Sequence, residues 1–341
     1  MIPITVTTIL LSLAFLVGEW LSLSGLDSKK QGGDQPSFYA AVFLNRGHVS
    51  GGASSNIGLF RREVGDTTWR NIYHPNLFTF GIGFWQRGST SRYYIAGGNG
   101  LHRSTDGGKS WRILTSWQTE EILSVALDPI DSSILYIATP FGVFKSTNEG
   151  KRWEKKMKGM EKWYVQQIII DGKNHRTLYA VAEDDLYRSR DAGDQWVALG
   201  VGVPGILTVL QHPVDPSVLI VGTEDDGVRV SDDGGKTWKA GRGLPRTAFY
   251  ALRSSPDGRT HYAGGYKSGL WKSGDMGGTW SLVWLAPEVE AILSIFVYPG
   301  NSQHLIIGTN GQGVYESLDG GRSWTNTGLK GAHVKQIELY P

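Results

Sequence analysis

The sequence predicts an all-β fold: a seven-bladed β-propeller with an N-terminal transmembrane helix. Three observations predict it, namely tryptophans that recur at a nearly fixed interval, a turn motif before most of them, and an uncharged apolar run at the start. Repeats of forty-odd residues that each hold four short strands are typical of propeller blades. Seven such repeats leave no room in 341 residues for a second globular domain.

The apolar run is the first element of the chain. Residues 2–17 carry no charged side chain, and the apolar character continues through Trp20 to about residue 23, which is long enough for one membrane-spanning helix. No Lys or Arg precedes the run and no Ala-x-Ala follows it, which favours an uncleaved anchor over a cleaved signal peptide. We expect a transmembrane anchor (or signal segment) in residues 1–24, inserted through residues 2–23, and a linker in residues 25–36.

Residues 37–341 are the predicted propeller. Successive intervals of 42, 42, 43, 42, 42 and 44 residues separate Trp69, Trp111, Trp153, Trp196, Trp238, Trp280 and Trp324. In the third repeat, apolar alternation and turn residues predict strands at 122–127, 134–139, 142–146 and 153–156. The turn motif is then the hairpin between the third and fourth strands of each blade.

The motif reads Ser-x-Asp-x-Gly-x-Ser/Thr-Trp in its complete copies. The copy before Trp153 has Asn148 in place of the Asp, and the copy before Trp196 has Gln195 in place of the hydroxyl residue. An Asp in a tight turn accepts backbone N–H groups, and Gly adopts the positive φ that such a turn needs. We therefore interpret the repeated aspartates as structural: Asp106, Asp191, Asp233, Asp275 and Asp319.

This pattern resembles the Asp-box of the bacterial neuraminidase repeat superfamily, and the resemblance extends over roughly residues 37–341. Within that superfamily, a lone seven-bladed ring behind an apolar segment is similar to the photosystem II stability/assembly-factor-like proteins. Those proteins are non-catalytic propellers that bind membrane photosynthetic complexes during assembly. The resemblance implies a photosynthetic reaction centre or photosystem as the partner, and it carries over no individual binding residue.

The two ends of the propeller domain are out of phase with each other. The last residues, 333–341, have the pattern of a first strand, whereas the domain begins near Phe38 with a second strand. We expect the strand at 334–340 to complete the first blade and close the ring. Closure removes the free sheet edge that would otherwise template aggregation.

Composition excludes several classes of function. The absence of cysteine excludes disulfides, Fe–S clusters and thiol nucleophiles, and the net charge of +2 argues against nucleic acid as the main partner. The eight histidines are scattered, without a His-x-His or His-Glu-x-x-His motif. We expect neither a metal nor a cofactor.

The rim opposite the turn motifs holds the candidate binding residues. Aromatic and arginine-rich surface is typical of protein interfaces, and the candidates for partner binding are Trp163, Lys162, Arg242, Arg246 and Trp284. Two acidic runs, 183–185 and 224–226, fall on the same rim. Paired carboxylates can bind Ca²⁺ or act as acid and base, although such runs are more often solvated loops.

The predicted function is that of a non-catalytic, membrane-tethered propeller, an interaction, assembly or accessory subunit of an integral-membrane complex. The alternative is an exported glycan-binding protein or a sialidase-like glycoside hydrolase. Sialidases, by resemblance, need an arginine cluster, a Tyr–Glu nucleophile pair, an acid–base Asp and an Arg-Ile-Pro segment, and this chain lacks that segment. We therefore expect no enzymatic activity.

The side of the membrane is indicated by two conflicting signals. Lys29 and Lys30 follow the apolar run, which by the charge rule directs the propeller toward the cytoplasm. Asp-box propellers behind apolar segments are, by resemblance, mostly exported. We expect the propeller on the periplasmic or extracytoplasmic side.

Overall fold

A computed structural model describes residues 36–45, 57–73, 78–116, 119 and 121–340. The predicted anchor, and the predicted linker except for Pro36, lie outside these residues. In the described part of the chain, no helix is long and apolar enough to cross a membrane.

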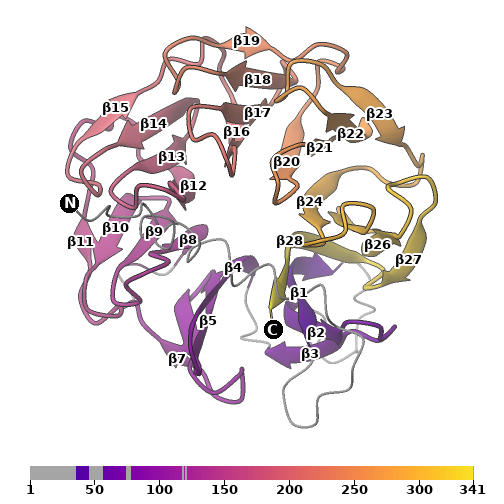
Figure 1. The fold of residues 1–341 in the computed structure, drawn as a ribbon. Helices are drawn as coiled ribbons and strands as arrows, with labels where there is room; N and C mark the ends of the chain where they lie inside the picture. Colours follow the sequence, from indigo (N-terminus) through magenta and orange to yellow (C-terminus); the bar gives the residue numbers. More distant parts are fainter. Residues whose placement is uncertain (1–35, 46–56, 74–77, 117–118, 120, 341) are drawn as a thin grey trace, which may run out of the picture.

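The described residues form seven four-stranded antiparallel sheets arranged as blades around a central axis (Figure 1). We call them blades A to G, in the chain order of their second strands. The innermost strands are β28 (Ala332–Tyr340), β4 (Thr79–Arg87), β8 (Ser124–Leu127), β12 (Val165–Ile170), β16 (Ile206–Gln211), β20 (Phe249–Ser254) and β24 (Ile292–Val297). The second strands are β1 (Ser37–Asn45), β5 (Thr90–Gly97), β9 (Leu135–Thr139), β13 (Leu178–Ala182), β17 (Leu219–Thr223), β21 (His261–Gly265) and β25 (Leu305–Thr309).

The outer half of each blade consists of shorter strands. The third strands are β2 (Gly58–Glu63), β6 (Gly100–Ser104), β10 (Gly142–Ser146), β14 (Asp185–Ser189), β18 (Val228–Ser231), β22 (Gly269–Ser273) and β26 (Val314–Ser317). The outermost strands are β3 (Arg70–Tyr73), β7 (Arg112–Ile113), β11 (Glu154–Lys155), β15 (Trp196–Ala198), β19 (Lys239–Ala240), β23 (Ser281–Trp284) and β27 (Thr325–Gly328). Several of these edge strands have only two residues, which limits edge-to-edge pairing with other chains.

Apolar side chains between the blades form the core. Each described cluster of buried residues joins two neighbouring blades; for example, Tyr94 and Leu101 of blade B pack with Ile137 of blade C. The second strands are buried at all five positions in blades C to G, because they have a neighbouring blade on both faces. Such strands are continuously apolar instead of alternating.

The predicted ring closure is confirmed. β28 pairs with β1 in an antiparallel register from Ser37↔Tyr340 to Asn45↔Ala332, with two irregularities near Val42. The strand begins two residues before the predicted start. In blade C the predicted first strand was too long: the backbone N–H of Ile122 donates to Gly97 of blade B, so regular pairing starts only at Ser124.

The repeated turns are held by the hydrogen bonds that the sequence predicts. Around Asp233, Oδ1 accepts the hydroxyl of Ser231 at 2.8 Å and the backbone N–H of Thr237 at 3.0 Å, and Oδ2 accepts the Thr237 hydroxyl at 2.6 Å. Asp106, Asp275 and Asp319 make the same bonds. Hydrogen bonds, that from Ser110 foremost, hold the pKa of Asp106 at about 2.

Tryptophans of these turns link neighbouring blades. The indole N–H of Trp153, Trp196 and Trp238 donates to a backbone carbonyl of the preceding blade, that of Leu114, Lys156 and Leu199 respectively. In the other complete turns the indole N–H of Trp111, Trp280 and Trp324 instead donates to a glycine carbonyl of the same turn. The tryptophans are therefore explained by packing.

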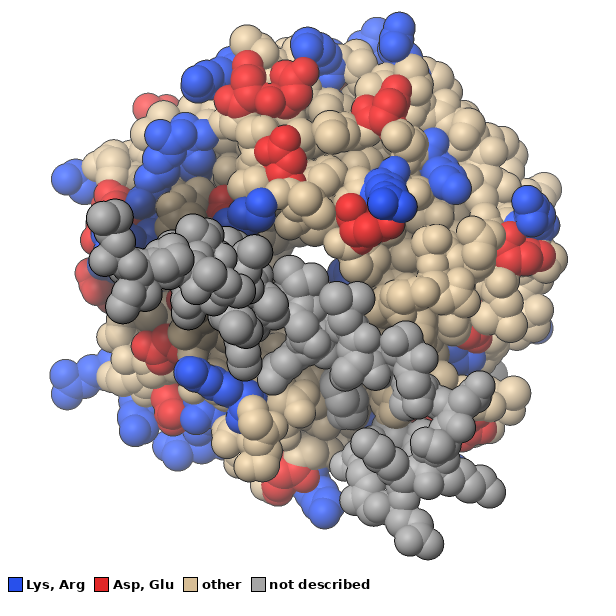
Figure 2. Space-filling model, in the orientation of Figure 1, with Lys and Arg blue, Asp and Glu red and all other residues tan. Residues whose placement is uncertain are grey.

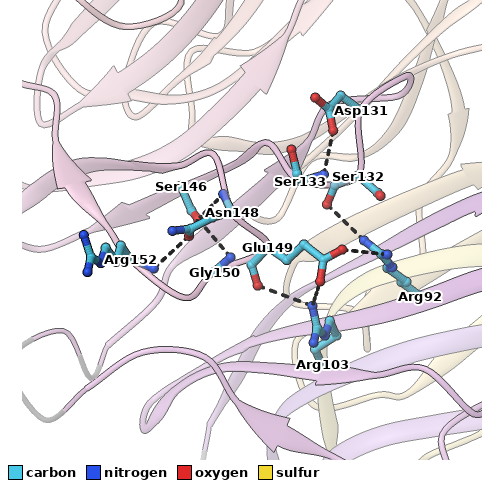
Figure 3. Close-up of polar contacts among 10 residues, drawn as sticks. All are labelled: Arg92, Arg103, Asp131, Ser132, Ser133, Ser146, Asn148, Glu149, Gly150 and Arg152. Atoms are coloured by element: carbon cyan, nitrogen blue, oxygen red, sulfur yellow. Dashed lines mark hydrogen bonds and ion pairs between the residues drawn. The ribbon is translucent and has the colours of Figure 1, made fainter.

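The turn of blade C replaces the missing aspartate with contacts to blade B (Figure 3). Asn148 still accepts the backbone N–H of Arg152, but there is no hydroxyl at that position. Glu149, which has a φ of 62°, is contacted by Arg92 at 2.9 Å and by Arg103 at 3.4 Å. Both arginines come from blade B and are largely buried, so their ion pairs with Glu149 join the two blades.

We predict that Asp233→Ala lowers the melting temperature by roughly 2–5 °C, because four donors of the turn lose their acceptor. Calorimetry measures this shift. Asp232→Ala is the matched control, since Asp232 contacts only the exposed Lys239. Association with a partner should be the same in both variants. A stable Asp233→Ala variant that no longer binds would show that Asp233 belongs to a binding site.

Candidate docking face

The exposed aromatic side chains lie on one face of the ring. In each blade the hairpin between strands two and three and the connection to the next blade are at the same end; we call this side the connection face, and the opposite side, which holds the Asp turns, the turn face. Among the described residues, the aromatic side chains that are more than one third exposed are Phe78, Phe141, Trp163, Tyr164 and Tyr250. All five lie in or beside connections and hairpins of the connection face.

Exposed apolar residues of the turn face are aliphatic or methionine. They include Ile130, Val214, Met276 and Leu318. Aromatic anchors are typical of interface centres, whereas single aliphatic residues are common on any surface. The distribution therefore distinguishes the connection face from the turn face.

A central channel runs between the inner strands. It has a volume of about 770 Å³, is lined by residues of all seven inner strands, and extends from Tyr164 and Tyr250 at the connection face to Lys173 at the turn face. Figure 2 shows an opening near the centre of the ring, and acidic and basic side chains interspersed on the face in view.

The channel wall is held by polar bonds between inner strands. Arg253 of β20 makes two hydrogen bonds of 3.0 Å to Glu338 of β28, and this carboxylate raises the pKa of Arg253. The Gln167 side chain accepts the backbone N–H of Val209 in the next blade, and Gln336 accepts that of Ile82. These polar groups are engaged in holding the channel itself.

Lys335 is a channel cation without a carboxylate partner among the described residues. Its ammonium lies 5.6 Å from the centre of the Phe43 ring, and burial lowers its pKa. Phe43 stacks on Phe78 at the connection face, with a distance of 4.7 Å between ring centres. The Lys335 ammonium thus lies next to the stacked rings of Phe43 and Phe78, on the side of the channel that is nearer the connection face.

Two of the predicted partner-binding residues, Lys162 and Trp163, lie together in the connection between blades C and D. The Lys162 ammonium is 3.5 Å from Glu183, and the backbone N–H of Trp163 donates to the same carboxylate at 3.3 Å. The indole is 58% exposed and lies under the ammonium of Lys155, 4.2 Å from the ring centre. The backbone is fixed while the indole faces solvent.

Arg242 and Arg246 lie in the connection between blades E and F, separate from Trp163. Arg246 pairs with Asp226, which also pairs with Arg229. The side chain of Arg242 is exposed, and its backbone bonds to Gly278 and Trp280 of the Asp turn in blade F, so Arg242 lies beside that turn. Both guanidinium groups are therefore available on the surface.

Trp284, the last candidate for partner binding, lies in a strand and not in a connection between blades. Trp284 is the last residue of β23 and is half-buried, with its ring centre 5.1 Å from that of Trp324 and 5.3 Å from that of Tyr315. Its ring fills the space between blades F and G. Its role in partner binding remains a prediction.

The acidic runs are engaged with their surroundings. Glu183 contacts Lys162, Asp184 accepts the backbone N–H of Gly205, and Asp226 pairs with two arginines. In the described residues, no three His, Asp or Glu side chains are grouped so that they could hold a metal ion.

Sequence reasoning missed Phe78, Phe141, Lys335 and the Arg253–Glu338 pair. The sequence could have predicted that Phe141 is exposed, because it lies in a tight hairpin, where a side chain is seldom buried in the core. The pair could not have been predicted in this way, since its residues are 85 positions apart.

Comparison with known proteins gives a family and several similar propellers. The family model described as "DUF6242 beta propeller domain" matches residues 132–330. The xyloglucanase Xgh74A of Acetivibrio thermocellus is 24% identical, over 71% of this chain and 37% of the relative. The chain spans less than half the length of the curated relatives that it matches.

Two groups of solved structures share the fold. The GH74 xyloglucanase of Xanthomonas campestris is 22% identical with a TM-score of 0.59, over 73% of this chain and 45% of that one. YCF48 bound to a D1 peptide is 17% identical with a TM-score of 0.56, over 72% of this chain and 80% of that one. At these identities the similarity shows the fold alone.

Proposed function

The chain belongs to the DUF6242 β-propeller domain family, and we propose that it is a non-catalytic docking subunit of an integral-membrane complex. The observation that carries the proposal is the position of all five exposed aromatic side chains on the connection face. Rigid aromatic residues beside charged groups are the usual anchors of protein interfaces.

The tether and the partner are the further parts of this proposal. Residues 2–23 anchor the chain in the membrane, with the propeller on the extracytoplasmic side, so that a membrane-embedded partner is at high effective concentration. The similarity to YCF48, which covers most of that shorter chain and was solved with a D1 peptide, supports a photosynthetic reaction centre or photosystem as the partner.

Charge reversal in the E–F connection tests the docking. We predict that Arg242→Glu with Arg246→Glu lowers co-purification with the membrane complex about tenfold, because aligned surface charges contribute to interface affinity. The melting temperature should fall only slightly, since both arginines are exposed and Asp226 keeps its ion pair with Arg229. Quantitative mass spectrometry of gently solubilised native membranes measures the association.

Arg190→Glu with Arg322→Glu is the matched control, because it changes the net charge equally in exposed residues of two Asp turns. This control should bind like the unaltered chain. If both double variants keep the complex intact, docking through Arg242 and Arg246 is wrong. If both lose it equally, net charge alone is responsible.

Glycan binding or hydrolysis is the second candidate, and the xyloglucanase relatives favour it. The discriminating assay incubates the full chain with xyloglucan and with sialosides and measures released reducing ends and sialic acid. Turnover that disappears on substitution of one carboxylate would replace the docking proposal. Its absence, together with a co-purifying membrane complex, supports docking.

A further inference from the structure

The connection between blades C and D is basic. Residues 156–164, which follow β11, contain three Lys and one Glu, a net charge of 3 − 1 = +2, and the E–F connection, residues 241–248, has the same net charge from Arg242 and Arg246. The D–E connection, residues 199–205, has no charged side chain, and the F–G connection, residues 285–291, has only Glu288 and Glu290. The connection face is thus basic at the C–D and E–F connections and acidic at the F–G connection.

Ion pairs neutralise only some of these cations. Lys156 lies between Glu154 and Asp194, at 2.6 and 2.8 Å, and Lys162 pairs with Glu183. Lys155 and Lys158 are exposed and form no ion pair with any residue that the structure describes. These two ammonium groups remain available to an anion from outside the protein.

Three exposed aromatic residues accompany the two free lysines. Trp163 and Tyr164 are 58% and 43% exposed, and Phe141 in the β9–β10 hairpin is 60% exposed. The hairpin and the connection are in contact, because the Lys156 backbone N–H donates to Val143 at 2.8 Å. We call the surface of Phe141, Lys155, Lys158, Trp163 and Tyr164 the C–D patch.

We propose that the C–D patch lies on the bilayer and binds anionic lipid headgroups. Trp and Tyr prefer the membrane–water interface, where the ring is in an apolar region and its polar atom stays hydrated. Lysines beside them attract the phosphates of anionic lipids. This inference rests on the proposed function, in which residues 2–23 hold the propeller near a membrane.

The exposed aromatic residues of the C–D patch and the acidic F–G connection together give the ring an orientation. The C–D side approaches the negative surface, while Glu288 and Glu290 on the F–G side are repelled from it. The propeller therefore tilts with blades C and D toward the lipid. The channel mouth and the arginines of the E–F connection remain accessible to a protein embedded beside the tether.

A single labelled site tests the proposal, because the chain contains no cysteine. The full chain with Phe141→Cys carries an environment-sensitive fluorophore and is incorporated into nanodiscs of phosphatidylcholine with or without phosphatidylglycerol. We expect a blue shift and quenching by spin-labelled lipid only with phosphatidylglycerol, reversed by molar salt. Leu318→Cys on the turn face, at a residue that is 70% exposed, should show neither effect.

Removing the free charges gives the second test. Lys155→Gln with Lys158→Gln, in the labelled chain, should lower the ratio of docked to undocked propeller about 30-fold, or about fivefold per lysine. Identical spectra in both lipids would overturn the proposal. So would a change that needs the co-purified protein partner and not the anionic lipid, because the patch would then be a protein interface.

Failure of the tether can be distinguished from failure of the patch. A chain that elutes apart from nanodiscs in size-exclusion chromatography contradicts the anchor in residues 2–23. The free chain is then titrated with phosphatidylglycerol vesicles, where the proposal still requires the same shift and the same effect of the lysine variants. A free chain without that shift overturns the C–D patch.

Discussion

Deletion of residues 332–341 is expected to abolish the cooperative unfolding transition. The deletion removes β28, and with it the inner strand of blade A and the contact that closes the ring. It also removes four large buried side chains, those of Val334, Ile337, Leu339 and Tyr340. At about 1.5–3 kcal/mol each, their burial contributes roughly 6–12 kcal/mol, which is comparable to the whole stability of a typical domain.

Calorimetry and urea unfolding measure this loss. Supplying residues 331–341 as a synthetic peptide should restore the transition, since β28 pairs mainly through backbone bonds with β1. A peptide of the same composition in scrambled order is the control. A truncated chain that melts like the full chain would show that blade A does not depend on β28.

Acidification from pH 6.5 to pH 4 is expected to remove about 6 kcal/mol of stability through two buried histidines. Burial lowers the pKa of His102 to about 4 and that of His261 to about 4, from an ordinary value of 6.5. As the pH falls below 6.5, these two histidines become protonated in the unfolded chain, whereas in the folded chain they stay neutral down to about pH 4. The folded state therefore loses stability across this window, by about 3 kcal/mol per histidine.

The contacts of these rings support the neutral form. His102 bonds Tyr73 at 2.7 Å and Asn99 at 2.6 Å, while His261 bonds Ser254 and has its other ring nitrogen buried without a partner. His212 lies 5.1 Å from His261 between ring centres, which adds to the lowering of the pKa of His261. A proton on His261 would therefore be buried without solvation.

Urea unfolding at several pH values measures the effect. His261→Asn should remove about half of the pH dependence between pH 6.5 and 4. The Asp turns lose their contribution mainly below this window, because the pKa of Asp106 and that of Asp319 are lowered from 3.8 to about 2, and the stability from such carboxyls is lost as the pH falls from about 4 toward 2. Equal pH dependence in His261→Asn and the unaltered chain would contradict this assignment.

Local features of the sequence were sufficient to predict the blades. The hydrogen bonds of an Asp turn join residues two to four positions apart, as between Ser231, Asp233 and Thr237, so their spacing is visible in the chain. Ring closure was also predictable, because β1 has the pattern of a second strand without a first, and β28 has the pattern of a first strand without a second. The start of the first strand in blade C was predicted less accurately, because Ile122 bonds to Gly97 of blade B before regular pairing begins at Ser124.

The exposure of individual aromatic residues could not be predicted. Phe249 and Tyr250 are adjacent, yet Phe249 is fully buried between blades E and F while Tyr250 opens onto the channel. Trp163 and Trp284 both stood near the end of a repeat, and only Trp163 faces solvent. Which side of a strand faces the channel depends on its pairing register, and a shift of one residue exchanges the two sides.

The sequence by itself determined the number of blades, the position of the turns, and the pairing of the two chain ends, because each depends on contacts within a repeat or on its phase. Only the tertiary structure decided which distant side chains meet. Glu149 joins Arg92 and Arg103 across two blades, and Arg253 reaches Glu338 across blade G. It also brought the exposed aromatic residues of separate blades to one face, since the ring places all connections at the same end.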